Sequence, residues 1–275
     1  MKKEKLVSII IAVYNGMKYI SETLECCYKQ TYKNLEVIII DDFSEDQSVK
    51  IIENYIKDKI NFKLIKNDKN LGIIQTINKG IDLSKGFFII NLGQDDLLYN
   101  NHVEIMIKNF TEDASLLFCD SNLINSKGEI FYEHNRKKKF FRNLKSVAYN
   151  LSLKNFINSC GLMYSKEKAL RVGKFQYFKK YPHYGEWLFW LKLLSVGQFF
   201  FVEETKSLYR RHEANITNTF KDYKTKKNLQ KYFLKCRKYA FENYFYEFNF
   251  KQKTIFLIII LKNKLKIFFG GRWWN

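Results

Sequence analysis

The sequence predicts an α/β fold with a mixed, mainly parallel sheet flanked by helices, followed by a helical C-terminal extension. Apolar runs of strand length alternate with segments of helical periodicity through the first hundred residues. The first run is rich in β-branched residues, as in strands that are buried on both faces. Such alternation implies right-handed crossovers, and therefore parallel strands with helices on both sides of the sheet.

Four strands and three helices are expected in this part of the chain. The predicted strands cover residues 6–15, 35–44, 61–67 and 87–92, and the helices between them cover residues 17–30, 45–58 and 71–86. Ser44 is the expected N-cap of the second helix, and Gly86 is expected to close the third.

Polar residues stand where three of these strands end. They are Tyr14, Asn15, Asp41, Asp42, Asp95 and Asp96. In sheets of this kind, ligands bind beyond the carboxyl ends of the strands. A shared ligand therefore explains the three polar ends better than three independent coincidences do.

The type of ligand follows partly by elimination. The chain has no G-x-G-x-x-G after the first strand, no phosphate-binding G-x-x-x-x-G-K-[ST] and no His/Cys cluster of zinc-site spacing. Acids at two strand ends, without a glycine-rich cradle, suit a hard divalent cation that bridges a diphosphate. We expect Asp95 and Asp96 to bind Mg²⁺ or Mn²⁺. The alternative is that these acids cap a helix that begins near residues 100–101.

Four segments resemble, in order and spacing, the inverting family 2 glycosyltransferases, which have the GT-A fold. They read VSIIIAVYN, LEVIIIDDFSED, NLGIIQTINKGI and NLGQDDLLYN, and the resemblance spans residues 6–217. It implies a sugar-nucleotide donor of the UDP or dTDP type. By this resemblance Ala12, Tyr14, Asp41 and Asp42 hold its base and ribose.

The last two segments imply contacts closer to the reacting sugar. Asn78 and Lys79 match a family segment near the donor sugar or phosphates. Gln94, Asp95 and Asp96 match the D-x-D-type signature, with Asp95 as the expected metal ligand.

Three positions depart from the family pattern. Ala12 stands where the family usually has Pro, Ile77 where many relatives carry Arg, and Gly93 where the first Asp of the signature usually stands. One carboxylate is therefore missing, and weaker metal binding or more reliance on the donor phosphates is expected.

A candidate base lies in the second half. The segment YPHYGEWLFWLKLLSVGQ has an apolar helical face with Glu186 in its first turn. It resembles the catalytic segment of the family, which implies that Glu186 removes the proton of the acceptor hydroxyl. The alternative is a carboxylate that only interacts favourably with the helix dipole.

The segment SLYRRHEANIT, residues 207–217, resembles the terminal Y-R-x-H element of the family. It implies that Arg210, Arg211 or His212 closes over the donor phosphates, with Arg211 taken as the donor-binding residue, and that His212 ligates the metal. A solvated basic turn is the alternative. The other histidines, His102, His134 and His183, are expected at the surface or in acceptor loops.

Charge bears on partners and location. The chain carries a formal net charge of +19, mostly from lysine, which fits either an anionic partner or the codon bias of an AT-rich genome. Residues 135–145 interleave bases with aromatics, suiting phosphate groups of a lipid-linked acceptor or nucleic acid.

The apolar run at 255–261 is far shorter than the ~20 residues that span a bilayer. The C-terminal segment instead resembles an interfacial helix, and a helix packed on the domain or on a second subunit is the alternative.

Together these observations predict a hexosyltransferase-type glycosyltransferase of class EC 2.4, dependent on Mn²⁺ or Mg²⁺ and inverting. Its expected acceptor is a glycan or lipid-linked hydroxyl in surface polysaccharide (capsule, LPS or O-antigen) biosynthesis. It is expected in the cytoplasm, peripheral on the inner face of the plasma membrane. Homo-oligomerisation stays open and nucleic acid is disfavoured.

The predicted organisation is a transferase domain over 1–217, with donor-binding half 1–100 and acceptor half 101–217, and a basic extension over 218–275 for membrane association or oligomerisation. Two rival functions are a nucleotidyltransferase and a basic module for membrane or nucleic acid with a degenerate transferase site. The nucleotidyltransferase is disfavoured because no Gly- and Arg-rich loop follows the first strand.

Overall fold

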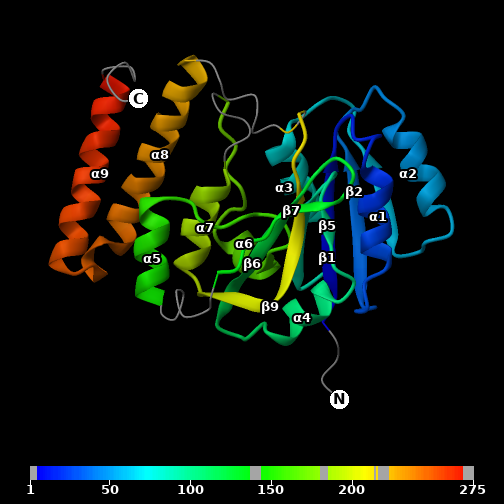
Figure 1. Ribbon diagram of the computed structural model, residues 1–275, viewed down its shortest axis with the longest axis horizontal. Helices are drawn as coiled ribbons and strands as arrows, with labels where there is room; N and C mark the ends of the chain where they lie inside the picture. The colour runs from blue at the N-terminus through cyan, green and yellow to red at the C-terminus, as the bar shows by residue number, and fades with distance from the viewer. Residues whose placement is uncertain (1–4, 137–143, 180–184, 214, 216–222, 269–275) are drawn as a thin grey trace.

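A computed structural model describes residues 5–136, 144–179, 185–213, 215 and 223–268. It confirms the predicted α/β architecture, and Figure 1 shows the sheet running through the middle of the molecule. The strands are β1 (Val7–Val13), β2 (Leu35–Asp41), β3 (Phe62–Lys66), β4 (Phe88–Gly93), β5 (Leu97–Leu98), β6 (Ala114–Ile124), β7 (Ile130–Tyr132), β8 (Met163–Ser165) and β9 (Gln198–Arg210). The helices are α1 (Ile20–Tyr28), α2 (Ser48–Ile56), α3 (Ile73–Leu83), α4 (His102–Lys108), α5 (Leu144–Leu153), α6 (Lys166–Arg171), α7 (Glu186–Leu194), α8 (Tyr223–Tyr244), the 3₁₀ turn η3 (Phe245–Glu247) and α9 (Phe250–Phe268).

One mixed sheet has the order β3-β2-β1-β4-β8-β6-β9-β5, and β7 pairs with β6. The strands β1 to β4 are mutually parallel, as the strand–helix alternation predicts. Beyond them β8 is antiparallel to both β4 and β6, whereas β6 and β9 are parallel to each other. The parallel half therefore presents three adjacent strand ends at one edge of the sheet.

Both faces of the sheet are covered, which explains the continuous apolar runs. In β1, Ile9 and Ile11 belong to one core with residues of α1, α2 and α4, whereas Ile10 faces a second core formed largely by α3, α5, α7 and α8. Figure 1 places α1 and α2 at one end of the molecule and α8 and α9 at the other.

Three local predictions are wrong. Gly86 does not close the third helix, because α3 ends at Leu83 and its C-cap is Ser84. Ser44 does not cap the second helix, because α2 begins at Ser48 after Gln47, and the Ser44 Oγ instead accepts a hydrogen bond from the Asn15 amide at 2.9 Å. His102 is not at the surface. It is fully buried, with Nδ1 3.0 Å from Thr205 Oγ1 and Nε2 2.6 Å from the Gly161 carbonyl, and burial lowers its pKa. The prediction for His183 lies outside the described residues.

Candidate active site

The ends of β1, β2 and β4 lie at the same level of the sheet. The register pairs Val13 with Asp41, and it pairs Ala12 with Gly93 on the other side. The three polar strand ends of the sequence therefore meet at one edge, as expected for parallel strands.

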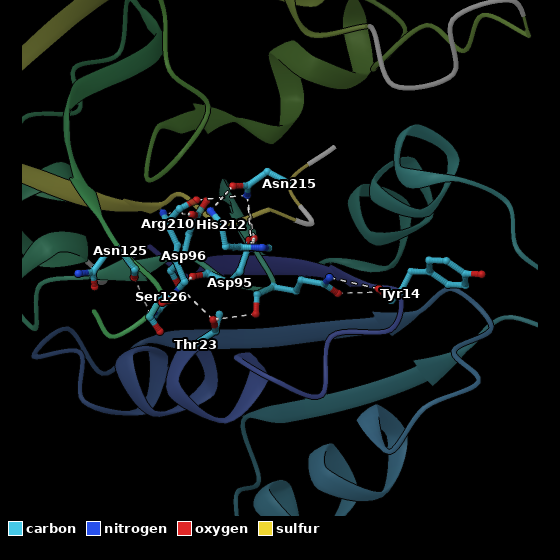
Figure 2. Close-up of polar contacts among 10 residues, drawn as sticks. Tyr14, Thr23, Asp95, Asp96, Asn125, Ser126, Arg210, His212 and Asn215 are labelled. Carbon is cyan, nitrogen blue, oxygen red and sulfur yellow. Dashed lines mark hydrogen bonds and ion pairs between the residues drawn. The ribbon is translucent and has the colours of Figure 1, made fainter. Parts of the chain in front are cut away.

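Gln94 joins the ends of β1 and β4. Its amide oxygen accepts from the Tyr14 amide at 2.9 Å, and its amide nitrogen donates to the Tyr14 carbonyl at 3.2 Å. Figure 2 shows that the Tyr14 ring extends from this junction away from Asp95. Since the ring is 46% exposed, it is accessible for stacking against a ligand.

Asp95 is held by residues that follow β9. Its Oδ2 lies 2.7 Å from His212 Nε2 and accepts from Asn215 Nδ2 at 3.3 Å (Figure 2). The backbone amide of His212 donates to Asn215 Oδ1 at 2.6 Å, which closes the turn. The structure thus brings together Asp95 and His212, two of the three residues that the sequence predicts as metal ligands.

Asp96 faces the interior. It is 5% exposed and its Oδ1 accepts from the Arg210 backbone amide at 3.0 Å. Burial and the neighbouring charge of Asp95 raise its pKa to about 8. It does not cap a helix, because β5 separates it from α4, whose N-cap is Asn101.

Arg210 is the central cation of this region, and it is not part of a solvated basic turn, the alternative that the sequence left open for its segment. Its side chain is fully buried, and Nη2 contacts Glu22 Oε2 of α1 at 2.6 Å. It also donates to the Asp95 carbonyl at 2.8 Å and to the carbonyls of Asn125 and Ser126 at 3.3 Å. Arg210 therefore fixes the backbone beneath the acids. The next residue, Arg211, is exposed, with its guanidinium 5.9 Å from the Tyr209 ring centroid.

The acids after β2 have different surroundings. Asp42 is buried and accepts from Asn67 Nδ2, the Leu71 amide and the Gly72 amide, each at 2.8 Å. It thereby fixes the loop that leads into α3. Asp41 is also buried, and its Oδ2 accepts from the Ser44 amide at 3.0 Å. Among the described residues, Oδ1 of Asp41 is buried and has no hydrogen-bond partner.

Lys79 and Asn78 extend from α3 in different directions. Lys79 Nζ donates to Asn67 Oδ1 at 2.6 Å and so joins the loop held by Asp42. Asn78 uses both ends of its amide on the backbone of Phe175, at 2.7 and 3.1 Å. A donor-binding role for Asn78 therefore has to coexist with this clamp. The sequence offered no signal for Asn67, because its partners lie far along the chain.

Glu186 occupies the first turn of α7, as predicted, and is partly buried. Burial raises the pKa of Glu186, and the neighbouring Ser159 hydroxyl acts in the opposite direction. The next residue, Cys160, places its thiol beside Asp96.

The acceptor segment is built as its sequence suggests. The strand β8 precedes α6, and the apolar residues of α7 are buried. At the junction, a Cβ on Gly185 would lie 3.0 Å from the Gln176 carbonyl and 3.1 Å from Ile74 of α3. The N-terminus of α7 therefore packs against the N-terminus of α3, next to the loop that Asp42 holds.

The surroundings of Gly93 leave little room for a carboxylate side chain at this position. A Cβ there would lie 2.6 Å from Asp96 Oδ2 and 3.0 Å from Asp95 Oδ1. The space used by a side chain in relatives is thus filled by the two carboxylates of this chain. Across the described residues, no group of three or more His, Cys, Asp or Glu side chains is arranged to hold a metal ion.

Asp95 and His212 nevertheless form a fitting pair of ligands. They offer a carboxylate oxygen and an imidazole nitrogen 2.7 Å apart. Two protein ligands fill only part of the coordination sphere of such a cation. The remaining positions would suit diphosphate oxygens and water. The site therefore resembles an ion-bridged diphosphate site more than a closed protein cage.

Comparison with known proteins agrees with this fold. The sequence profile described as "Glycosyl transferase family 2" matches residues 8–171, more than half of the chain. An uncharacterised glycosyltransferase of Rickettsia typhi is 32% identical over 217 residues, which cover 78% of this chain and 66% of that protein. The chain belongs to glycosyl transferase family 2 and is a transferase of class EC 2.4.

Solved structures show the same fold at low identity. Residues 1–349 of S. aureus TarS, in complex with UDP-GlcNAc, match with a TM-score of 0.70 and 17% identity over 94% of this chain and 72% of that chain. The mannosyltransferase PcManGT from Pyrobaculum calidifontis, in complex with GDP-Man and Mn²⁺, matches with a TM-score of 0.61 and 11% identity over 98% and 89% of the two chains. The GT-A fold expected from the sequence is thereby confirmed.

Proposed function

We propose that this protein transfers a sugar, with inversion, from a nucleoside diphosphate donor to a hydroxyl of a glycan or lipid-linked acceptor. The observation that carries the proposal is the packing of the first turn of α7, which holds Glu186, against the first turn of α3, next to the loop held by Asp42. The reaction needs a base close to the donor-binding edge, and this packing supports that arrangement. The TarS and PcManGT complexes with UDP-GlcNAc and GDP-Man support a nucleotide-sugar donor.

Donor binding is assigned to the edge formed by β1, β2 and β4. The exposed Tyr14 ring offers a stacking surface for the base, and the unpartnered Asp41 Oδ1 offers an acceptor for a base N–H. A uracil or thymine ring carries such a donor, which fits a UDP- or dTDP-sugar. Asp42 and Lys79 support the loop in front of α3 through Asn67.

Asp95 and His212 would hold Mn²⁺ or Mg²⁺ together with the donor diphosphate, and the Mn²⁺ in the PcManGT complex supports this. The cation would offset the negative charge that develops on the departing diphosphate. Arg211 lies on the adjoining turn and contributes positive potential there.

The reaction is a single displacement. Glu186 removes the proton of the acceptor hydroxyl as its oxygen attacks the anomeric carbon, and the bond from that carbon to the diphosphate oxygen breaks. The electron pair of the broken bond leaves with the nucleoside diphosphate, which needs no proton from a second acid, unlike the alcohol released in glycosidases. A positioned base contributes roughly 10²–10⁴-fold to such a step. A raised pKa makes Glu186 a stronger base than an ordinary glutamate.

The test is transfer from a panel of nucleotide sugars in the presence of Mn²⁺, with the product configuration read by NMR. We expect an inverted anomeric configuration with wild type and loss of transfer in Glu186→Gln. The control is Glu167→Gln, since Glu167 occupies the first turn of α6 but is exposed. A retained configuration, or equal losses in the two variants, would contradict the proposal.

The biological setting is proposed from the same features. Surface polysaccharide biosynthesis, of the capsule or LPS type, would supply glycan or lipid-linked acceptors to the side of the site formed by α7 and the Ser159 loop. Assays with isolated lipid-linked glycans as acceptors would separate this proposal from transfer to a soluble acceptor.

A further inference from the structure

The helix α9 has one face that is fixed against the rest of the protein. Phe256 is fully buried against Phe245 and Phe248, with ring centroids 6.0 and 5.7 Å away. Two turns later Asn263 is 4% exposed, and its amide binds two residues of α8. Its Oδ1 accepts from Arg237 at 2.8 Å, and its Nδ2 donates to Gln230 Oε1 at 2.8 Å. These contacts set the rotation of α9 about its own axis.

The opposite face of α9 is apolar and exposed. Leu265 lies nine residues after Phe256, which is two and a half turns at 3.6 residues per turn, and so points away from the protein. Its neighbours on this outward face are 37% to 87% exposed. The stripe consists of Phe250, Leu257, Ile258, Leu261, Leu265 and Phe268. An exposed apolar stripe of this kind, in which Thr254 is the polar residue, is typical of an interaction surface.

Lysines flank the stripe on both sides. By helical position, Lys251, Lys262 and Lys266 border one edge, and Lys253 and Lys264 border the other. The helix contains no aspartate or glutamate over its whole length. An apolar face between two rows of lysines matches the cross-section of a bilayer surface, where the lysine stems cover apolar area and the ammonium groups reach the headgroups.

We infer that this outward face of α9 docks on the surface of an anionic lipid bilayer. A second copy of the chain is a poorer occupant, because two faces bordered only by lysines would repel each other. No helix of the described residues combines the length and apolar content that a membrane crossing requires. The helix would therefore lie in the plane of the interface, with its stripe in the acyl boundary.

The position of α9 in the fold fits this role. Figure 1 shows α9 at the outer end of the molecule, beyond α8 and opposite α1 and α2. Docking would therefore leave the donor-binding edge free and bring the α7 side of the protein nearer to the bilayer. The inference does not depend on the proposed transfer reaction.

The experiment is co-sedimentation of the full chain with phosphatidylcholine vesicles, with and without phosphatidylglycerol. Wild type should sediment only with the anionic vesicles. The variant Leu261→Ser with Leu265→Ser should lower the partition coefficient at least tenfold. Changing Lys251, Lys262 and Lys266 to Gln should lower it on the order of a hundredfold at low salt.

Matched controls use exposed residues on the other side of the protein. The pair Ile60→Ser and Phe87→Ser removes two exposed apolar side chains, and Lys57, Lys69 and Lys85 to Gln removes three exposed charges. Both controls should bind as wild type does. Thermal melting checks that all variants are folded, as expected for substitutions at exposed positions.

Unchanged binding by the α9 variants, or equal binding of wild type to neutral and anionic vesicles, would overturn the inference. Sedimentation velocity measures the oligomeric state and so tests whether a second copy of the chain covers the stripe. A dimer that dissociates on Leu261→Ser with Leu265→Ser, without any vesicle binding, would assign the stripe to a second copy instead.

Discussion

His212 Nε2 lies 2.7 Å from Asp95 Oδ2, although 117 residues separate the two in the sequence. This contact joins the loop after β4 to the turn after β9. It places an imidazole and a carboxylate at the edge where the donor diphosphate is proposed to bind.

Removing either partner of this pair should remove cation-dependent nucleotide binding. In His212→Ala and Asp95→Asn, we expect addition of Mn²⁺ to change UDP affinity little, whereas in wild type it should tighten binding at least tenfold. Isothermal titration with and without Mn²⁺ measures this directly. The control is Asp58→Asn, because Asp58 is an exposed acid just after α2. Metal-enhanced binding that survives in both site variants would show that other residues hold the cation.

The pH dependence of transfer should report Glu186. The base acts when it is deprotonated, so activity rises with pH through its pKa. Because burial raises that pKa above the ordinary 4.5, the rising limb should lie at higher pH than an unperturbed glutamate would produce. The profile of kcat/KM should lose this limb in Glu186→Gln, together with about 10²–10⁴-fold of the rate. A limb that persists in the variant would belong to another group.

Substituting Arg210 should destabilise the protein strongly. In Arg210→Met, the carbonyls of Asp95, Asn125 and Ser126 lose their buried donor, at a cost of about 3 kcal/mol in the free energy of unfolding. The partner substitution Glu22→Gln should cost less than about 1 kcal/mol, because the Glu22 side chain is 51% exposed. Urea unfolding of both variants measures the difference. Equal costs would mean that the ion pair, and not the carbonyl contacts, carries the effect.

The hydrogen bonds that Asp42 accepts predict the effect of replacing it with asparagine, which has nearly the same shape. In Asp42→Asn an amide NH₂ replaces one of two oxygens that accept from Asn67, Leu71 and Gly72, so a donor faces a donor. We expect a loss of about 1–3 kcal/mol in stability and weaker nucleotide binding from the loosened loop. Thermal melts and UDP titration are the measurements, with Asp58→Asn as the surface control. Unchanged melting would show that the loop before α3 is held by other contacts.

The sequence predicts well those features that depend on local pattern. The strand β1 and its parallel neighbours follow from β-branched runs buried on both faces, and the acids at their ends follow from the placement of ligands in parallel sheets. The first turn of α7 places Glu186 where the apolar periodicity indicates.

Features that depend on distant partners were not predictable in this way. His102 reads as a surface residue, yet it is buried because Thr205 and Gly161 supply partners from other strands and loops. Ser44 reads as a helix cap, but its hydroxyl accepts from Asn15, whose φ of 50° turns the chain after β1. Arg210 and Arg211 are neighbours in the sequence, and only the carbonyls around Arg210 show which of the two arginines is buried.

The clamp between Asn78 and Phe175 has a consequence for how substrates enter. Its two hydrogen bonds tie α3 of the donor side to the segment after α6 of the acceptor side. A hinge motion that separates α3 from the segment after α6 would therefore break both bonds. We expect nucleotide and acceptor to bind without such a motion.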